Sequence, residues 1–157
     1  MADVLDKAKS LYDHDFYAWT REQAAVLRSR AGRGTAGDAI DWDRLAEEVE
    51  DLGESQRSEI ESRLAILLVH LLKWRFQPTH RSSGWKGTIV EQRSRLARRL
   101  RRSPSLRPYP AAILAEEYEI ARLKAAGETD LPEAIFPETC PFTIEQVLDP
   151  AFYPDAG

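Results

Sequence analysis

The apolar stretch from Leu64 to Leu72 constrains the fold of this chain more than any other feature of the sequence. It belongs to a pattern in which apolar residues recur every three or four positions, as on one face of an α-helix. A membrane span needs roughly 20 apolar residues, and this stretch is about half as long and contains His70. It therefore predicts a buried central helix. The stripe comprises Ile60, Leu64, Leu67, Leu68, Leu71 and Leu72, extended around the helix by Ala65, Ile66 and Val69.

Capping residues and glycines suggest where the helices begin and end. Thr20 and Gln23 have the spacing of a capping box, which predicts a first helix over about residues 16–30. The glycine-rich segment 32–37 then reads as a surface loop. A second helix is expected to start at Asp41, and Gly53 should stop or kink it. A third helix then runs to about Phe76 and a fourth from Ser83 to before Ser103. A fifth runs from about Pro110 to Ala126, where Gly127 ends it.

The two ends of the chain read differently from its middle. Roughly the first 12 residues mix charged and small side chains and are expected to be loosely held. Residues 131–157 hold five prolines and one short helical turn, capped by Thr143 and Gln146, and should form an extended wrap. No repeat or hairpin signature is visible. The sequence thus predicts one all-α domain over residues 1–157, a bundle of about five helices with an irregular proline-rich C-terminal wrap.

The compartment follows from cysteine usage and from the N-terminus. Cys140 is the only cysteine, so it can form no internal disulfide and gives no sign of an oxidising environment. The first ten residues lack the hydrophobic centre of a signal peptide. We therefore expect a cytoplasmic protein that does not enter a membrane.

Several short motifs occur together along the chain. They include Asp13-His14-Asp15-Phe16-Tyr17-Ala18-Trp19, Asp41-Trp42-Asp43, His70-Leu71-Leu72-Lys73-Trp74, Ser83-Gly84-Trp85, Pro104-Ser105-Leu106 and Glu128-Thr129. With these motifs the chain resembles the bacterial domain of unknown function 29 family from about Asp13 to Pro154. The resemblance implies a compact helical bundle. It assigns no activity, so no catalytic residue can be carried over.

The charged residue that fits its position least well is Arg93. It lies beside the apolar face of its helix, which Trp85, Ile89, Leu96 and Leu100 define, so its charge needs a partner there. Glu48 borders the apolar face of the second helix and is the best candidate. We predict a structural Glu48–Arg93 ion pair that joins two helices, in preference to a binding or catalytic role.

His70 is the other candidate for chemistry. It lies at the edge of the central stripe, where an imidazole could act as a base, although a structural histidine bonded to a carboxylate is the simpler interpretation. The paired Glu-x-x-His spacing of a bundle metal site is absent, and no glycine-rich phosphate loop follows a strand, so neither a metal nor another cofactor is predicted. A small hydrolytic enzyme using His70, Glu48 and Arg93 remains the alternative function.

Charge is divided unevenly along the chain. Between residues 81 and 107, nine basic residues oppose only Glu91, whereas after Arg107 ten acidic residues oppose Arg122 and Lys124. The basic helix could pair with the acidic segments or simply face water. If the basic helix does neither, its charge predicts a non-enzymatic interaction module that contacts an acidic protein partner or a nucleic acid backbone. The predicted binding residues are Arg95, Arg98, Arg99, Arg101 and Arg102. The oligomeric state is left open by the sequence.

Overall fold

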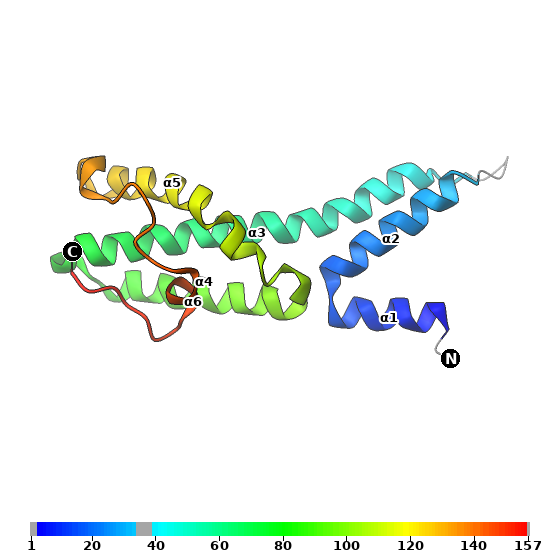
Figure 1. Ribbon diagram of the computed structural model, residues 1–157, viewed down its shortest axis with the longest axis horizontal. Helices are drawn as coiled ribbons and strands as arrows, with labels where there is room; N and C mark the ends of the chain where they lie inside the picture. Colours follow the sequence, from blue (N-terminus) through cyan, green and yellow to red (C-terminus); the bar gives the residue numbers. More distant parts are fainter. Residues whose placement is uncertain (1–2, 34–38, 157) are drawn as a thin grey trace. The chain divides into compact units, whose positions relative to one another are not determined.

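The computed structural model describes residues 3–33 and 39–156, and across these residues the chain forms six α-helices and no strand (Figure 1). None of the helices in the described ranges is long and apolar enough to cross a membrane. The all-α prediction is confirmed. The helices are α1 (Val4–His14), α2 (Phe16–Ala31), α3 (Trp42–Phe76), α4 (Ser83–Arg102), α5 (Tyr109–Thr129) and α6 (Ile144–Leu148), with 3₁₀ turns at Pro78–His80, Pro104–Leu106 and Glu133–Ile135.

The chain divides into two compact units. Unit 1 lies within Met1–Ser58 and Arg99–Arg107, and unit 2 within Glu59–Arg98 and Pro108–Gly157. Helices α3 and α4 contribute residues to both units. That the whole chain forms one domain stays a prediction, and the two units are described separately below.

Unit 1 is organised around Asp15, the residue between α1 and α2. Its carboxylate caps α2 by accepting a hydrogen bond from the Ala18 amide at 3.0 Å. The same carboxylate accepts bonds from the amide and hydroxyl of Ser105, at 2.7 and 2.8 Å. The Ser103 hydroxyl in turn accepts a bond from the Tyr17 amide at 3.1 Å. The start of α2 is therefore tied to the turn that follows α4.

Helix α2 lies beside the N-terminal half of α3 at a close approach that requires glycine (Figure 1). A Cβ atom at Gly53 would stand 2.3 Å from the Thr20 hydroxyl oxygen and 3.3 Å from the Thr20 Cβ atom. Thr20 is fully buried, and its hydroxyl donates to the Tyr17 carbonyl at 2.7 Å. Gly53 is therefore a packing position within a continuous α3, rather than the end of a helix.

Replacing Gly53 by alanine should destabilise unit 1. Overpacking of a well-fitted site costs about 2 kcal/mol, more than the roughly 1 kcal/mol that alanine gains over glycine inside a helix. We expect a net loss of about 1 kcal/mol in the free energy of unfolding, measured by urea titration.

Gly87 on α4 supplies the matched control for this substitution, because a Cβ atom added there would meet nothing within 4 Å. Gly87→Ala should be stabilising by about 1 kcal/mol. In a Thr20→Ala background, Gly53→Ala should cost less, because the Thr20 hydroxyl oxygen is gone and only the contact with the Cβ atom at 3.3 Å remains. A Gly53→Ala variant as stable as Gly87→Ala would contradict the close approach of α2 and α3.

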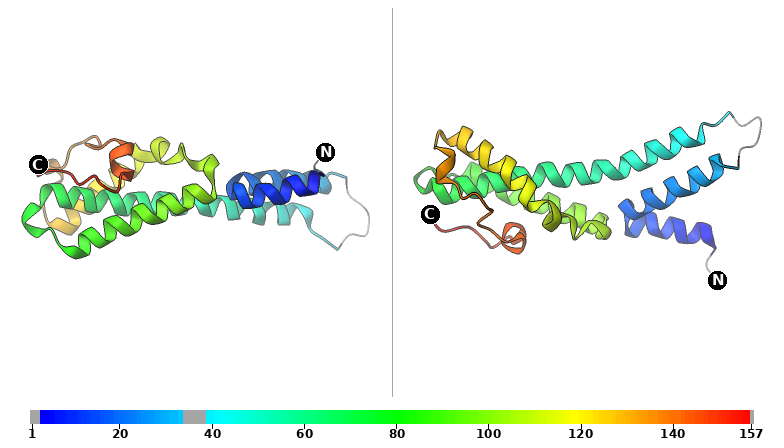
Figure 2. Two further views of the ribbon diagram at one scale, coloured as in Figure 1. Left: turned by 90° about the horizontal axis from the view of Figure 1, so that it is seen from below. Right: turned by 45° about the horizontal axis from the view of Figure 1, so that its top comes forward.

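The core of unit 2 is built on the stripe of the central helix. Leu64, Leu67, Leu68, Leu71 and Leu72 are each fully buried. Helices α4 and α5 pack against this part of α3, and the chain after α5 crosses the helices to reach α6 (Figure 2). The core is completed by Ile89, Leu96, Ile113, Tyr118, Ala121, Ala125, Phe136, Phe142 and Val147.

The other predicted helix starts and ends are partly confirmed. The Thr143–Gln146 capping box is present at α6, and Asp41 accepts a bond from the Arg44 amide at 3.0 Å at the start of α3. The prediction of a Thr20–Gln23 capping box was wrong, because Asp15 caps the start of α2 and Thr20 lies inside that helix. Gly127 does not end α5, which runs on to Thr129 and stops at Asp130 in the left-handed conformation, with φ 55°.

Two further expectations concern the less regular segments. The N-terminal residues expected to be loosely held form α1, none of whose described residues is buried. The predicted loop at 32–37 falls largely on residues 34–38, which lie outside the described ranges. The proline-rich tail has the expected irregular course, with only one 3₁₀ turn and α6.

Candidate functional site

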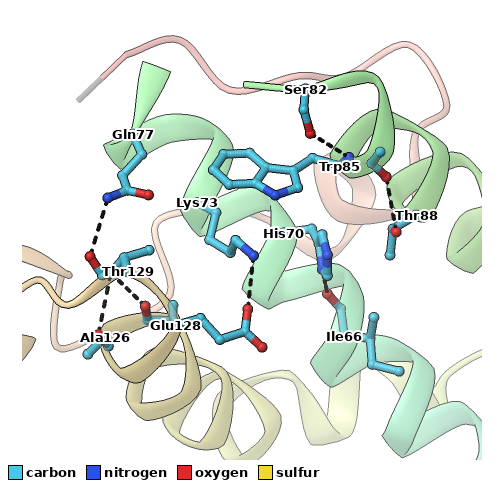
Figure 3. Close-up of polar contacts among 12 residues, drawn as sticks. Ile66, His70, Lys73, Gln77, Ser82, Trp85, Thr88, Ala126, Glu128 and Thr129 are labelled. Carbon is cyan, nitrogen blue, oxygen red and sulfur yellow. Dashed lines mark hydrogen bonds and ion pairs between the residues drawn. The ribbon is translucent and has the colours of Figure 1, made fainter. Parts of the chain in front are cut away.

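A half-buried polar cluster in unit 2 joins three helices around Lys73 (Figure 3). The Lys73 ammonium group is 2.9 Å from a carboxylate oxygen of Glu128 on α5, and 4.7 Å from the centre of the Trp85 ring on α4. The Lys73 side chain is only 12% exposed, so the carboxylate and the ring together replace much of its water. Gln77, the residue that directly follows α3, donates to the Thr129 carbonyl at 3.4 Å.

His70 lies on α3 one turn before Lys73 (Figure 3). Its Nδ1 atom is 2.8 Å from the Ile66 carbonyl, and a carbonyl can only accept, so Nδ1 carries the proton in this contact. In the neutral form of the imidazole, the Nε2 atom would then be an acceptor. The Thr88 hydroxyl donates to the Gly84 carbonyl at 3.2 Å.

This geometry corrects one expectation. His70 is bonded to a main-chain carbonyl, and the described residues show no hydrogen bond from it to a carboxylate. The carboxylate that orients and charges a catalytic imidazole is therefore not among its described contacts. The cluster as it stands is best suited to holding α3, α4 and α5 together.

Arg93 is buried, as its position beside the apolar face suggested, but its hydrogen bonds go elsewhere than expected. Its Nε atom donates to the Val147 carbonyl at 2.8 Å and its Nη2 atom to the Gln146 carbonyl at 3.3 Å, both on α6. The guanidinium group therefore fixes α6 to α4 within unit 2. Glu48 is an exposed residue of unit 1, so the Glu48–Arg93 ion pair receives no support here and stays a prediction.

The five arginines predicted to bind a partner have different environments. Arg95 is exposed and pairs with Glu91 one turn earlier, at 2.9 Å. Arg98 and Arg101 are exposed, with no hydrogen bond or ion pair to another described residue. Arg99 donates to the Gln56 side chain, and Arg102 lies over the Tyr12 ring at 4.9 Å. Arg99 and Arg102 are thus partly engaged within unit 1.

Neither a metal site nor a reactive thiol is evident in the described ranges. No group of three His, Cys, Asp or Glu side chains there could hold a metal ion. Burial raises the pKa of the Cys140 thiol, whose sulfur lies 3.4 Å from the Phe142 carbonyl. A raised pKa keeps the thiol protonated at neutral pH and makes it a poor nucleophile.

Sequence reasoning missed the two clusters that the fold assembles. Lys73, Trp85 and Glu128 are far apart in the chain, as are Asp15 and Ser105. All five lie in motifs that carry the family resemblance, which was the available signal. Which motifs meet depends on how α3, α4 and α5 pack, and this cannot be read from helical periodicity.

Comparison with known proteins agrees with this helical fold. A crystal structure of an α-helical protein of unknown function from Rhodospirillum rubrum matches with a TM-score of 0.72 and 22% sequence identity, covering 90% of each chain. At this identity the likeness extends to the fold alone. No curated protein matches the sequence. The family model described as "Domain of unknown function DUF29" matches residues 11–153, and the chain belongs to this family.

Proposed function

We propose that the chain is a non-enzymatic interaction module in which exposed arginines of α4 bind an acidic surface of a protein partner. The observation that carries this proposal is the exposure of Arg98 and Arg101, which make no hydrogen bond or ion pair to another described residue. The Arg95 guanidinium, 48% exposed and held by Glu91, extends the same basic helix.

Arg99 and Arg102, the other two predicted binding residues, make contacts within the chain, which reduces the number of arginines free to bind a partner directly to three. Arg102 lies over Tyr12 and Phe16 and donates to the Asp13 carbonyl at 3.5 Å, so part of its role is structural. Arg99 donates a hydrogen bond to the Gln56 side chain. The proposal therefore assigns direct contact to the exposed Arg95, Arg98 and Arg101, and gives Arg99 and Arg102 a supporting role through their positive charge.

A protein partner fits this surface better than a nucleic acid. Three exposed guanidinium groups would neutralise about three phosphates, fewer than the roughly six to ten that a strong duplex binder contacts. The chain also carries a net charge of −4, which opposes a long polyanion. A short cluster of carboxylates on a folded protein needs fewer basic residues to pair with it. The proposed setting is the cytoplasm, with which the unpaired Cys140 thiol is consistent.

The alternative, a hydrolytic site of His70, Glu48 and Arg93, gains no support from the contacts of these residues. The His70 proton is bonded to a carbonyl, and the pocket beside Arg93 is not lined by His70. Glu48 belongs to the other unit. No observation on the described residues favours this function over binding.

The proposal is tested by fluorescence anisotropy with a short labelled polyglutamate peptide, duplex DNA and single-stranded RNA, each in a salt series. We expect the peptide to bind at low salt and to weaken about tenfold in an Arg95→Gln/Arg98→Gln/Arg101→Gln variant. The matched control is Lys7→Gln/Lys9→Gln/Lys124→Gln, which removes three exposed positive charges elsewhere. Equal losses of peptide affinity in both variants would mean that net charge, and not this surface, determines binding. Tighter binding of DNA or RNA than of the peptide would indicate a nucleic acid partner in place of a protein.

A further inference from the structure

The guanidinium group of Arg93 is buried with a hydrogen-bond donor left over. The residue is 5% exposed, and its Nε and Nη2 atoms are used by the carbonyls of Val147 and Gln146. The Nη1 atom is shielded from solvent and has no hydrogen-bond partner in the described part of the chain. Buried donors of native proteins are nearly always paired, so an unpaired one on a charged group calls for an explanation.

The charge of Arg93 is also incompletely balanced. Its partners are carbonyl dipoles and the face of the Tyr153 ring, 5.5 Å from the guanidinium carbon. Asp149 is near enough to favour the charged form but makes no ion pair with it, and its carboxylate accepts a bond from the Ala151 amide at 2.9 Å. A buried cation without a carboxylate partner attracts an anion, because pairing recovers part of the energy lost on desolvation.

A pocket of about 290 Å³ opens beside this group, between α4 and the chain around α6. Among the described residues that line it, Arg93 is the one charged residue and Ser94 the one other polar side chain. The remaining lining residues, Val90, Ala97, Leu148 and Pro150, are apolar. The pocket therefore combines walls that favour a short hydrocarbon chain with a neighbouring cation, whose free Nη1 donor is shielded from solvent and reaches the pocket only if the side chain moves.

We propose that this pocket binds an organic monocarboxylate with a short aliphatic tail. The carboxylate accepts from Nη1 of Arg93 after a small movement of the side chain, and the tail packs between Val90 and Leu148. Phosphate is a poor fit, since only one guanidinium group is present and the other walls are apolar. The same chemistry occurs in a free short-chain acid and in the C-terminal residue of a peptide ending in leucine.

This inference is independent of the proposed function. Arg95, Arg98 and Arg101 do not line the pocket, and the ligand is a single small anion instead of an acidic surface. Either proposal can therefore fail without affecting the other.

The test is an amide NMR titration of the full chain with hexanoate and, separately, with hexan-1-ol, which matches its tail without the charge. We expect hexanoate to shift amide signals of residues 90–97 and 147–150 and to bind at least about tenfold more tightly than the alcohol. Acetyl-Gly-Gly-Leu with a free carboxylate, compared with its amide, distinguishes a peptide terminus from a small acid as the source. Equal binding of hexanoate and hexan-1-ol, or no localised shifts with either hexanoate or the free-acid peptide, would overturn the proposal.

Two variants separate the charge from the shape of the pocket. Arg93→Met keeps an apolar side chain in place and should abolish the preference for hexanoate over hexan-1-ol. Ala97→Trp fills the pocket from an exposed position and should abolish binding of both, even if Arg93→Met fails to fold. Ala112→Trp, at an exposed position of α5 outside the pocket, should bind hexanoate like the unmodified chain. Binding of hexanoate unchanged in Ala97→Trp would refute the assignment to this pocket.

Discussion

Replacing Tyr118 by alanine should lower the free energy of unfolding of unit 2 by about 4 kcal/mol, the largest effect expected of any substitution proposed for this chain. The Tyr118 side chain is 1% exposed, and its hydroxyl donates to the Pro137 carbonyl at 2.6 Å. Truncation therefore leaves a large cavity under α5 and frees the tail that the hydroxyl holds. Urea titration measures the loss. Leu123→Ala on the same helix, where Leu123 is 56% exposed, is the control and should change stability by less than about 0.5 kcal/mol.

The Tyr118 hydrogen bond can be tested separately from packing with Tyr118→Phe. This change keeps the ring and leaves the Pro137 carbonyl without its donor, so we expect a loss of about 1 kcal/mol at neutral pH. A loss as large as that of the alanine variant would mean that the hydrogen bond, and not the ring, dominates.

Alkaline pH should reduce the difference in the free energy of unfolding between the unmodified chain and Tyr118→Phe. Burial raises the pKa of Tyr118 from 10.0 to about 12, so the folded state favours the protonated hydroxyl. A raised pKa in the folded state stabilises the fold fully below pH 10.0, and the contribution is lost as pH rises through about 12. The unmodified chain should therefore lose stability over this range faster than Tyr118→Phe. Parallel pH profiles of the two proteins would contradict the burial of the hydroxyl.

The second large effect is expected at Asp15, where alanine should destabilise unit 1 by about 2 kcal/mol. The substitution removes the cap of α2 and both bonds to Ser105, leaving the Ala18 and Ser105 amides without their acceptor. Urea titration gives the total loss. Hydrogen exchange shows whether the first turn of α2 and the turn after α4 open together, as a shared carboxylate requires.

Asp13 provides the matched control for Asp15. It carries the same charge two residues away, its carbonyl accepts from Arg102 at 3.5 Å, and its carboxylate has no hydrogen bond to another residue in the described ranges. Asp13→Ala should therefore change stability by less than about 0.5 kcal/mol. Asp15→Asn keeps one acceptor oxygen and should fall between the two alanine variants. Equal effects of Asp13→Ala and Asp15→Ala would show that charge, and not the hydrogen bonds, is responsible.

The candidate site was only partly predictable because its partners are distant in the sequence. Helical periodicity placed Arg93 beside the apolar face of α4, and the residue is indeed buried. Periodicity carries no information on which element lies opposite, so the carbonyls of α6 were not foreseen as its partners. The same limit applies to Lys73. A lysine is expected to be exposed, and only the packing of the helices brings Trp85 and Glu128 to it.

The sequence by itself determined the all-α class, the central helix with its leucine stripe, the limits of α4 and the capping box of α6. Each of these follows from local spacing, because side chains three or four residues apart share a helix face and caps satisfy nearby amides. Only the tertiary structure decided that Gly53 continues α3, that Asp15 joins α2 to the turn after α4, and that Arg93 holds α6. These outcomes depend on atoms brought within a few ångströms by packing, where a single methyl group or an unpaired donor changes the energy more than any local preference.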